Sequence, residues 1–112
     1  MDSRFPKKYR LVSKRDFQRL IESKSSVADH TLVLYYQAND CGFPRLGVAV
    51  GKKLGKAAYR NRLKRWIRES FRHHREALSK PVDVLVMVRR KTEIKSFKKV
   101  ENSFMQLAKK LP

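Results

Sequence analysis

The segment from residue 56 to about residue 75 constrains the fold most, because it divides a helix into two unlike faces. At about 100° per residue, one arc of about 140° is mainly apolar. That arc holds Tyr59, Leu63, Trp66, Ile67, Ser70 and Phe71. The rest of the segment carries eight basic residues and a single acidic one, Glu69. This division predicts a helix that packs its apolar face against other elements and leaves a cationic face outside.

The patterns around that helix predict two further helices and three strands. The run Val82–Val88 is apolar at nearly every position, as a central buried strand should be. The other elements are a helix over residues 13 to about 23, strands over 31–37 and 46–50, and a helix from about Ser96. The resulting order, α-β-β-α-β-α, predicts an α+β fold, a single-domain α-β sandwich over residues 1–112.

Local signals refine the first helix and its surroundings. Ser13 and Asp16 form a variant of the capping box, in which the Ser13 side chain caps free backbone N–H groups. Val12 and Phe17 have the spacing of a hydrophobic staple across the start of the helix. Residues 1–10 are basic and unpatterned, so we expect them to form a mobile arm. The polar segment 24–29 is predicted to be a loop.

The first two strands are expected to pair as a hairpin, because turn-forming residues occupy positions 39–44 between them. In the first strand, Val33 and Tyr35 face one side of the sheet. In the second, Gly47 and Ala49 share a face and would leave a shallow trough beside Tyr35 if the two faces coincide.

The charge of the chain indicates its class of partner. Lys and Arg number 28 against 10 Asp and Glu, a formal net charge of +18 on 112 residues. Such a charge opposes a compact fold by self-repulsion, which favours a polyanion as partner: nucleic acid first, an anionic membrane surface second. Like charges four residues apart repel on a helix, and the basic helix repeats that spacing at Arg60, Lys64, Arg68 and Arg72. This face indicates phosphate binding, and aromatic side chains on the sheet favour RNA over DNA.

Several classes of protein are disfavoured. The single cysteine, Cys41, excludes an intramolecular disulfide and an all-cysteine metal site. No apolar run approaches the roughly 20 residues of a membrane helix, and residues 1–10 contain no signal-peptide core. A protein-only ribonuclease would need acid and base groups, for which His30, His73 and His74 are poorly placed and better interpreted as solvated. A helix-turn-helix DNA binder is also disfavoured, whereas composition leaves a ribosomal or other structural RNA-binding protein open.

The basic helix also carries a specific motif. The run Arg60-Asn61-Arg62-Leu63-Lys64-Arg65, with Ile67, Arg68 and Phe71 after it and Gly51-Lys52-Lys53-Leu54-Gly55 before it, resembles the central motif of the bacterial ribonuclease P protein component. The resemblance implies a left-handed crossover at this helix. It also implies a cytoplasmic protein that joins a catalytic RNA, which removes 5′ leaders from precursor tRNA with its own Mg²⁺. No catalytic residue, bound metal, cofactor, membrane or protein partner is then expected of the chain itself.

The resemblance also implies two sets of binding residues. The catalytic-RNA contacts would be Lys52, Lys53, Lys56, Arg60, Asn61, Arg62, Lys64, Arg65, Arg68 and Arg72. A cleft between the first helix and the sheet would take the single-stranded leader, and would be lined by Phe17, Ile21, Val33 and Tyr35. Phe17 is equally suited to an ordinary core position, whereas Tyr35 favours a surface or cleft position because its hydroxyl needs a partner.

Overall fold

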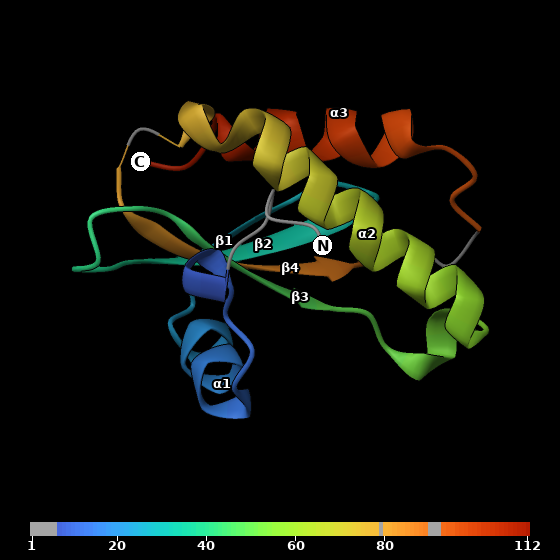
Figure 1. Ribbon diagram of the computed structural model, residues 1–112, viewed down its shortest axis with the longest axis horizontal. Helices are drawn as coiled ribbons and strands as arrows, with labels where there is room; N and C mark the ends of the chain where they lie inside the picture. The colour runs from blue at the N-terminus through green and yellow to red at the C-terminus, as the bar shows by residue number, and fades with distance from the viewer. Residues whose placement is uncertain (1–6, 79, 90–92) are drawn as a thin grey trace.

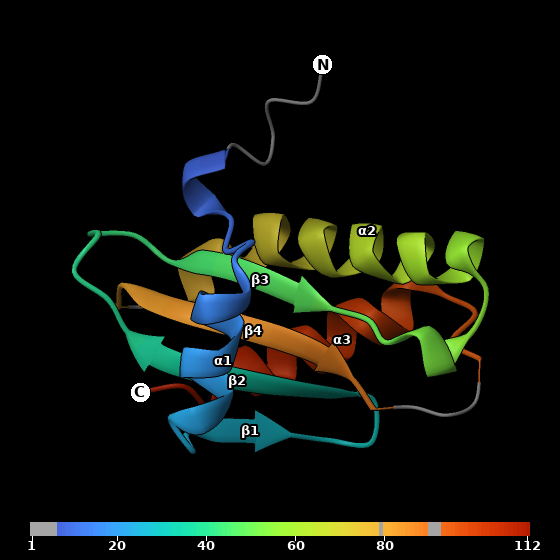
Figure 2. The ribbon, with the colours of Figure 1, turned by 90° about the horizontal axis from the view of Figure 1, so that it is seen from below.

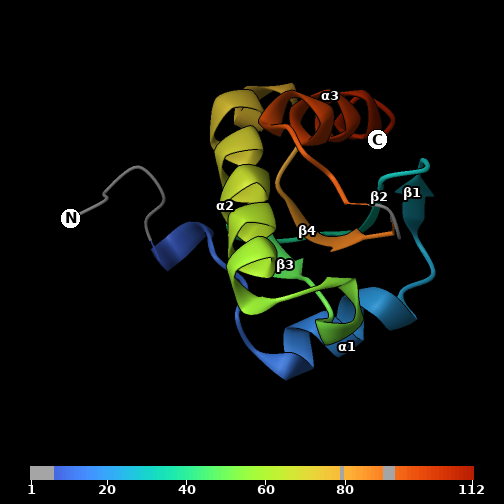
Figure 3. The ribbon, with the colours of Figure 1, turned by 90° about the vertical axis from the view of Figure 1, so that its right-hand side faces the viewer.

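The structure is a computed structural model that describes residues 7–78, 80–89 and 93–112. A four-stranded sheet lies between α1 on one face and α2 with α3 on the other (Figures 1 and 3). In chain order the elements are the 3-10 helix η1 (Lys7–Tyr9), α1 (Lys14–Glu22), β1 (Ser26–Ala28), β2 (Leu32–Ala38), β3 (Arg45–Ala49), η2 (Lys52–Leu54), α2 (Ala57–His74), η3 (Arg75–Ala77), β4 (Val82–Val88) and α3 (Phe97–Ala108). The three predicted helices and the α+β class are confirmed.

The strand order in the sheet is β1-β2-β4-β3, so the predicted hairpin between β2 and β3 is wrong. The strand β4 lies between them, antiparallel to β2 and parallel to β3. Residues 82–86 of β4 are all buried. A strand that buries both of its faces lies in the interior of a sheet. The chain therefore passes from β3 through α2 to β4. With α2 above the sheet in Figure 1 and β3 beside β4 in Figure 2, this crossover is left-handed.

The predicted loop over residues 24–29 is also wrong in part, because it contains the short edge strand β1. Ser26 pairs with Tyr35 and Ala28 pairs with Val33 in an antiparallel register. Both Ser26 and Ala28 are exposed, so the strand lacks the apolar alternation that would have revealed it. It covers only part of β2, whose last residues extend beyond it.

Each face of the sheet has its own hydrophobic core. On the α2 and α3 side, Phe71 and Phe104 are fully buried and meet edge to face with their ring centroids 6.4 Å apart. On the α1 side, a smaller cluster is formed by Leu11, Leu20 and Leu85. The smaller cluster positions α1, the helix that carries two of the predicted leader contacts.

The segment before α1 is attached to the sheet. The backbone N–H of Leu11 donates to the carbonyl oxygen of Leu46 at 2.8 Å, and Arg10 forms a parallel β-bridge with Leu46. The mobile-arm prediction is therefore wrong for residues 7–10, and its remainder, residues 1–6, lies outside the described residues. Val12 is 80% exposed, so the predicted staple is also wrong, since the neighbouring Leu11 takes the buried position. The cap is confirmed: Ser13 Oγ accepts from the N–H of Asp16 at 3.0 Å.

Candidate nucleic-acid interface

The cationic face of α2 is the first part of the candidate interface. In the predicted apolar arc, Leu63, Ile67 and Phe71 are buried. The opposite side of the helix therefore faces the solvent. No hydrogen bond or ion pair to another described residue is made by the side chains of Lys64, Arg65 or Arg68, and the two arginines are exposed. These three positive charges, on two successive turns of the helix, are available to phosphates.

The start of α2 adds further cations. Lys52, Lys53 and Lys56 are exposed in η2 and at the first turn of the helix, and Asn61 is exposed beside them. Arg60 donates from Nε to the carbonyl oxygen of Gly55 at 3.0 Å. Gly55 has φ 147°, and a Cβ atom there would lie 2.9 Å from the Tyr59 ring, so a side chain would strain this turn.

Arg62 differs from the other predicted RNA contacts. Its guanidinium carbon lies 5.6 Å from the Tyr59 ring centroid and 5.5 Å from that of Trp66. Its Nη2 lies 3.6 Å from the Glu93 carboxylate, and its Nε is buried without a hydrogen-bond partner among the described atoms. Arg62 therefore packs α2 against the segment before α3, and its replacement by alanine would remove a packing contact as well as a charge.

The last turns of α2 are tied to α3 and carry compensated charge. Arg72 donates to Glu69 at 2.8 Å. His73 Nδ1 and His74 Nε2 lie 3.3 and 3.1 Å from the same oxygen of Glu101 on α3. Both histidines thus join the helices; the expectation of solvated histidines holds for His73, which is exposed, and is wrong for His74, which is partly buried. Within the described ranges, the predicted contacts on α2 that form no ion pair with an acidic residue include Lys64, Arg65 and Arg68.

The predicted leader residues lie on the α1 side of the sheet, but they differ in exposure. Phe17 and Tyr35 are half-buried and pack against the smaller core, and Val33 lies on the same face of β2 as Tyr35. Ile21 instead is 41% exposed on α1. The predicted trough beside Gly47 is wrong, because β4 separates β2 from β3 and the Phe17 ring occupies the space: a Cβ atom on Gly47 would lie 2.7 Å from it.

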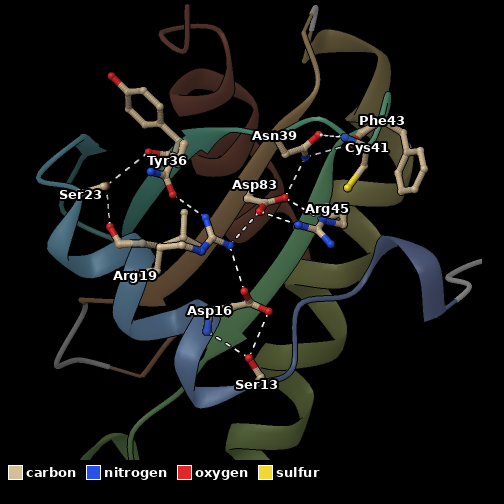
Figure 4. Close-up of polar contacts among 12 residues, drawn as sticks. Ser13, Asp16, Arg19, Ser23, Tyr36, Asn39, Cys41, Phe43, Arg45 and Asp83 are labelled. Carbon is tan, nitrogen blue, oxygen red and sulfur yellow. Dashed lines mark hydrogen bonds and ion pairs between the residues drawn. The ribbon is translucent and has the colours of Figure 1, made fainter.

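A buried carboxylate holds α1 against the sheet (Figure 4). Asp83, at the start of β4, is 1% exposed and accepts hydrogen bonds from Arg19 of α1, Asn39 of the β2–β3 turn and Arg45 of β3, at 2.8–2.9 Å. Arg19 also donates to Asp16 and Gln37. Burial acts to raise the pKa of Asp83, but the hydrogen bonds from these three side chains outweigh it and lower the pKa.

This network was missed in the sequence, although it gave a signal. Asp83 is the only charged residue within an otherwise apolar strand, Val82–Val88, and a carboxylate in such a place needs cationic partners. Sequence distance hid which ones they were, since Arg19 lies 64 positions away.

The described residues hold no cluster of metal-ligating side chains and no membrane-spanning helix. Within 7–78, 80–89 and 93–112, no three His, Cys, Asp or Glu side chains are grouped so as to hold a metal ion. No helix in these ranges is long and apolar enough to cross a membrane. The structure has two surfaces suited to RNA. One is the cationic face of α2, and the other is formed by α1 and β2, which carry the aromatic side chains Phe17 and Tyr35.

Comparison with known families decides between the kinds of RNA-binding protein. The model of the family described as Ribonuclease P matches residues 5–112. The chain belongs to the ribonuclease P protein family. Among similar ribonuclease P protein components, that of Alkaliphilus oremlandii is 32% identical over 102 residues, which cover 91% of this chain and 90% of the relative. That of Thermotoga maritima is 36% identical over 91 residues, 81% of this chain and 78% of the relative.

Solved structures of ribonuclease P proteins share the fold. The Staphylococcus aureus ribonuclease P protein superposes with a TM-score of 0.80 at 35% identity, covering 88% of this chain and 91% of that one. The Thermotoga maritima ribonuclease P protein gives a TM-score of 0.83 at 34% identity, with 92% and 97% covered. The predicted family and fold class are thereby confirmed.

Proposed function

We propose that this ribonuclease P protein component binds the 5′ leader of precursor tRNA and leaves the chemistry to the ribonuclease P RNA and its Mg²⁺. The family assigns the chain to ribonuclease P, and hence to partnership with that RNA. The non-catalytic role is supported by the contacts of the histidines: His73 and His74 both lie within 3.3 Å of one Glu101 oxygen instead of meeting over an open site. We assign this processing to the bacterial cytoplasm.

The observation that carries the proposal is the uneven pairing of charge along α2. Arg62 and Arg72 are paired with acidic residues, whereas among the described residues no ion pair is formed by Lys64 or Arg65, so their mutual repulsion is not relieved in that way. A polyanion relieves that repulsion. We therefore propose that Lys64, Arg65 and the exposed lysines Lys52, Lys53 and Lys56, together with Arg60 and Asn61, contact the catalytic RNA. Arg62 and Arg72 would support this surface from its edges.

The α1 face is the proposed leader site. Single-stranded RNA is bound by stacking its bases on aromatic rings, which is tolerant of sequence. Tyr35 and Phe17 provide such rings on adjoining elements, and Val33 extends the apolar surface along β2. Ile21, exposed on α1, would add an aliphatic contact without stacking.

Reconstitution tests the function directly. The purified protein is incubated with precursor tRNA in Mg²⁺, with and without the ribonuclease P RNA, and leader release is measured. We expect no cleavage by the protein alone, and tighter precursor binding with a lower Mg²⁺ requirement when it joins the RNA. Cleavage by RNA-free protein would refute the non-catalytic role, and a protein without effect on the RNA would refute the subunit role.

The catalytic-RNA surface has its own test. Arg65→Ala should weaken binding to the ribonuclease P RNA and reduce the slope of log affinity against log salt by about one unit, the amount expected for one phosphate contact. Lys109→Ala, on an exposed lysine just after α3, is the matched control and should leave the slope unchanged. An unchanged slope for Arg65→Ala would show that this face of α2 does not meet the RNA.

A further inference from the structure

The outer side of α3 borders a polar groove that neither proposed RNA site includes. The helix lies on the face of the sheet opposite to α1 (Figure 3). The groove runs between α3 and the turn that joins β1 to β2, has a volume of about 220 Å³, and is lined by Asp29, Thr31, Lys99, Asn102, Ser103 and Gln106. A second hollow of about 220 Å³ shares Lys99 with the groove and extends to Lys95, just before α3.

The packing of α3 turns the wall of this groove outward. Val100 and Phe104 are fully buried on the inner side of the helix. At about 100° per residue, Lys99, Asn102 and Gln106 fall within an arc of about 60° on the other side. All three are exposed, and no described element lies outside α3 in Figures 1 and 3. The fold therefore presents a cation and two amides to the same ligand.

The opposite wall of the groove is fixed by Asp29. Its carboxylate accepts from Ser103 Oγ at 2.5 Å and from the backbone N–H groups of Thr31 and Leu32 at 2.8 Å each. Burial acts to raise the pKa of Asp29, but these hydrogen bonds outweigh it and lower the pKa. A carboxylate offers about four lone-pair sites, so Asp29 can accept one further hydrogen bond from a ligand.

The end of the groove at the start of α3 is cationic. Lys95 and Lys99 are exposed, and neither side chain forms an ion pair or hydrogen bond with another described residue. Glu93, which lines the second hollow, lies 3.6 Å from Arg62. Lys99 stands in the first turn of α3, which contains no acidic residue although the helix dipole favours negative charge there. A phosphate beside Lys99 would relieve this unfavourable placement.

The mixture of groups matches the backbone of double-stranded RNA. The amides of Asn102 and Gln106 can donate and accept, and Asp29 can accept, which suits a ribose 2′-hydroxyl. No aromatic side chain lines the groove, so an unpaired base would find no ring to stack on. Double-stranded RNA is instead bound through 2′-hydroxyls and phosphates across its minor groove.

We propose that this groove binds the ribose–phosphate backbone of a base-paired RNA segment. Lys95 and Lys99 hold phosphate oxygens, while Asn102, Gln106 and Asp29 form hydrogen bonds with 2′-hydroxyls. The inference rests on the proposed function, to which it adds an RNA contact outside α2 and the leader site. Helices of the ribonuclease P RNA and the stems of tRNA share this chemistry, so the experiment separates them.

The test compares Lys99→Gln and Asn102→Ala with Lys109→Gln, which removes an exposed lysine one turn beyond the groove. Each protein is titrated with ribonuclease P RNA over a series of salt concentrations, and tRNA is then titrated onto the saturated holoenzymes. All three variants should keep the wild-type melting temperature, because the replaced side chains are exposed.

The two groove variants should differ in their salt dependence. For the RNA that occupies the groove, Lys99→Gln should weaken binding about 5-fold at about 0.15 M salt and reduce the salt slope by about one unit, the contribution of one phosphate contact. Asn102→Ala should weaken binding about 5-fold with an unchanged slope, because it removes a neutral hydrogen bond. Lys109→Gln should change neither quantity.

A pair of short duplexes of the same sequence, one of RNA and one of DNA, tests the hydroxyl contact. Asn102→Ala should lower the ratio of RNA affinity to DNA affinity, since DNA lacks the 2′-hydroxyl. Lys99→Gln should weaken both affinities and leave the ratio unchanged. An unchanged ratio for Asn102→Ala would overturn the assignment of a 2′-hydroxyl to this groove.

The pattern of losses identifies the RNA. Weaker binding of ribonuclease P RNA assigns the segment to that RNA, and equal losses for precursor and mature tRNA assign it to a tRNA stem. A loss confined to precursor tRNA would overturn the inference, because the ligand would then be the single-stranded leader. Groove variants that bind every RNA as Lys109→Gln does would also overturn it and leave the proposed function intact. Wild-type protein that failed to bind ribonuclease P RNA would refute the proposed function itself.

Discussion

Replacing Asp83 by asparagine is the most informative single perturbation of the fold. The carboxylate is 1% exposed and joins α1, the β2–β3 turn and β3 through hydrogen bonds from Arg19, Asn39 and Arg45. Asparagine has nearly the same shape, so Asp83→Asn creates no cavity. It removes the negative charge and turns one acceptor oxygen into an NH₂ group that faces the guanidinium donors.

The magnitude follows from burial. Breaking a buried ion pair by removing one partner costs about 3–5 kcal/mol of stability, because the opposite charge is left without compensation. Arg19 and Arg45 are partly exposed, with 36% and 27% of their side-chain surface accessible, so water relieves part of the loss and the lower end of that range is expected. For a domain of this size, about 3 kcal/mol lowers the melting temperature by about 12 °C.

The assay is urea unfolding at fixed salt, followed by circular dichroism at pH 7. Asp40→Asn is the matched control, since Asp40 is an exposed carboxylate in the turn next to Asn39. We expect the control to stay within about 0.5 kcal/mol of wild type. An Asp83→Asn protein that is destabilised by less than about 1 kcal/mol would refute the reasoning that this carboxylate holds α1 in place.

The pH dependence of the free energy of unfolding tests the same network. Because the pKa of Asp83 is lower in the folded state than the ordinary aspartate value, its contribution to stability is complete above that ordinary value, about pH 4, and is lost as the pH falls through the folded pKa. The free energy of unfolding should therefore fall more steeply below pH 4 for wild type than for Asp83→Asn. Parallel curves would contradict the lowered pKa.

Three further outcomes are expected. Leu63→Ala should cost about 2–5 kcal/mol of stability in urea unfolding, because Leu63 is fully buried, whereas Arg65→Ala should change it by less than about 0.5 kcal/mol. Gly47→Ala should destabilise the fold by about 1–3 kcal/mol and lower the affinity for precursor tRNA, because the new Cβ atom displaces the Phe17 ring. A variant with the melting temperature and precursor affinity of the wild type would refute this. Tyr35→Ala should weaken precursor binding about 10-fold with mature tRNA unaffected, whereas a purely core role predicts lower stability and equal losses for both.

The helices could be predicted from sequence because their signals are local. Ser13 with Asp16, and Ser96 with the N–H of Lys99 at 3.2 Å, cap helices through residues three positions apart. The apolar arc of α2 is likewise a property of one continuous segment. The central place of β4 was also visible, since Val82–Val88 is apolar on both faces.

Strand pairing was mispredicted because it depends on contacts between distant segments. With three recognised strands, a central β4 already required neighbours on both sides, which is incompatible with a hairpin of β2 and β3. The turn residues at 39–44 favour a local hairpin of β2 and β3. The stability gained when β4 is buried on both faces and paired along both edges outweighs this preference for a short connection. The handedness of the crossover came only from the family resemblance, since right-handed crossovers are the general rule.

For the candidate site, the sequence located the cations but not their partners. Glu69, three residues before Arg72, was a visible local partner on the helix. Glu93 lies 31 positions after Arg62, too far for the pattern of α2 to indicate it, whereas Trp66 is four residues after Arg62 and its place beside this arginine is a local feature of the helix. Arg10 was assigned to an unstructured arm, because a single β-bridge leaves no periodic signal in the sequence.

The few acidic residues explain how a chain of charge +18 both folds and binds RNA. Three of the ten lie where elements meet: Asp83 between α1 and β3, Glu101 between α2 and α3, and Asp29, which accepts from Ser103, between the β1–β2 turn and α3. These three therefore bind groups inside the fold, and within the described part of the chain no ion pair is formed by Arg65 on the outer face of α2. Stability and RNA affinity consequently depend on different cations. Loss of Arg45 should unfold part of the protein, but the folded fraction should keep the same salt dependence of RNA binding. Loss of Arg65 should change the salt dependence of RNA binding and leave the protein folded.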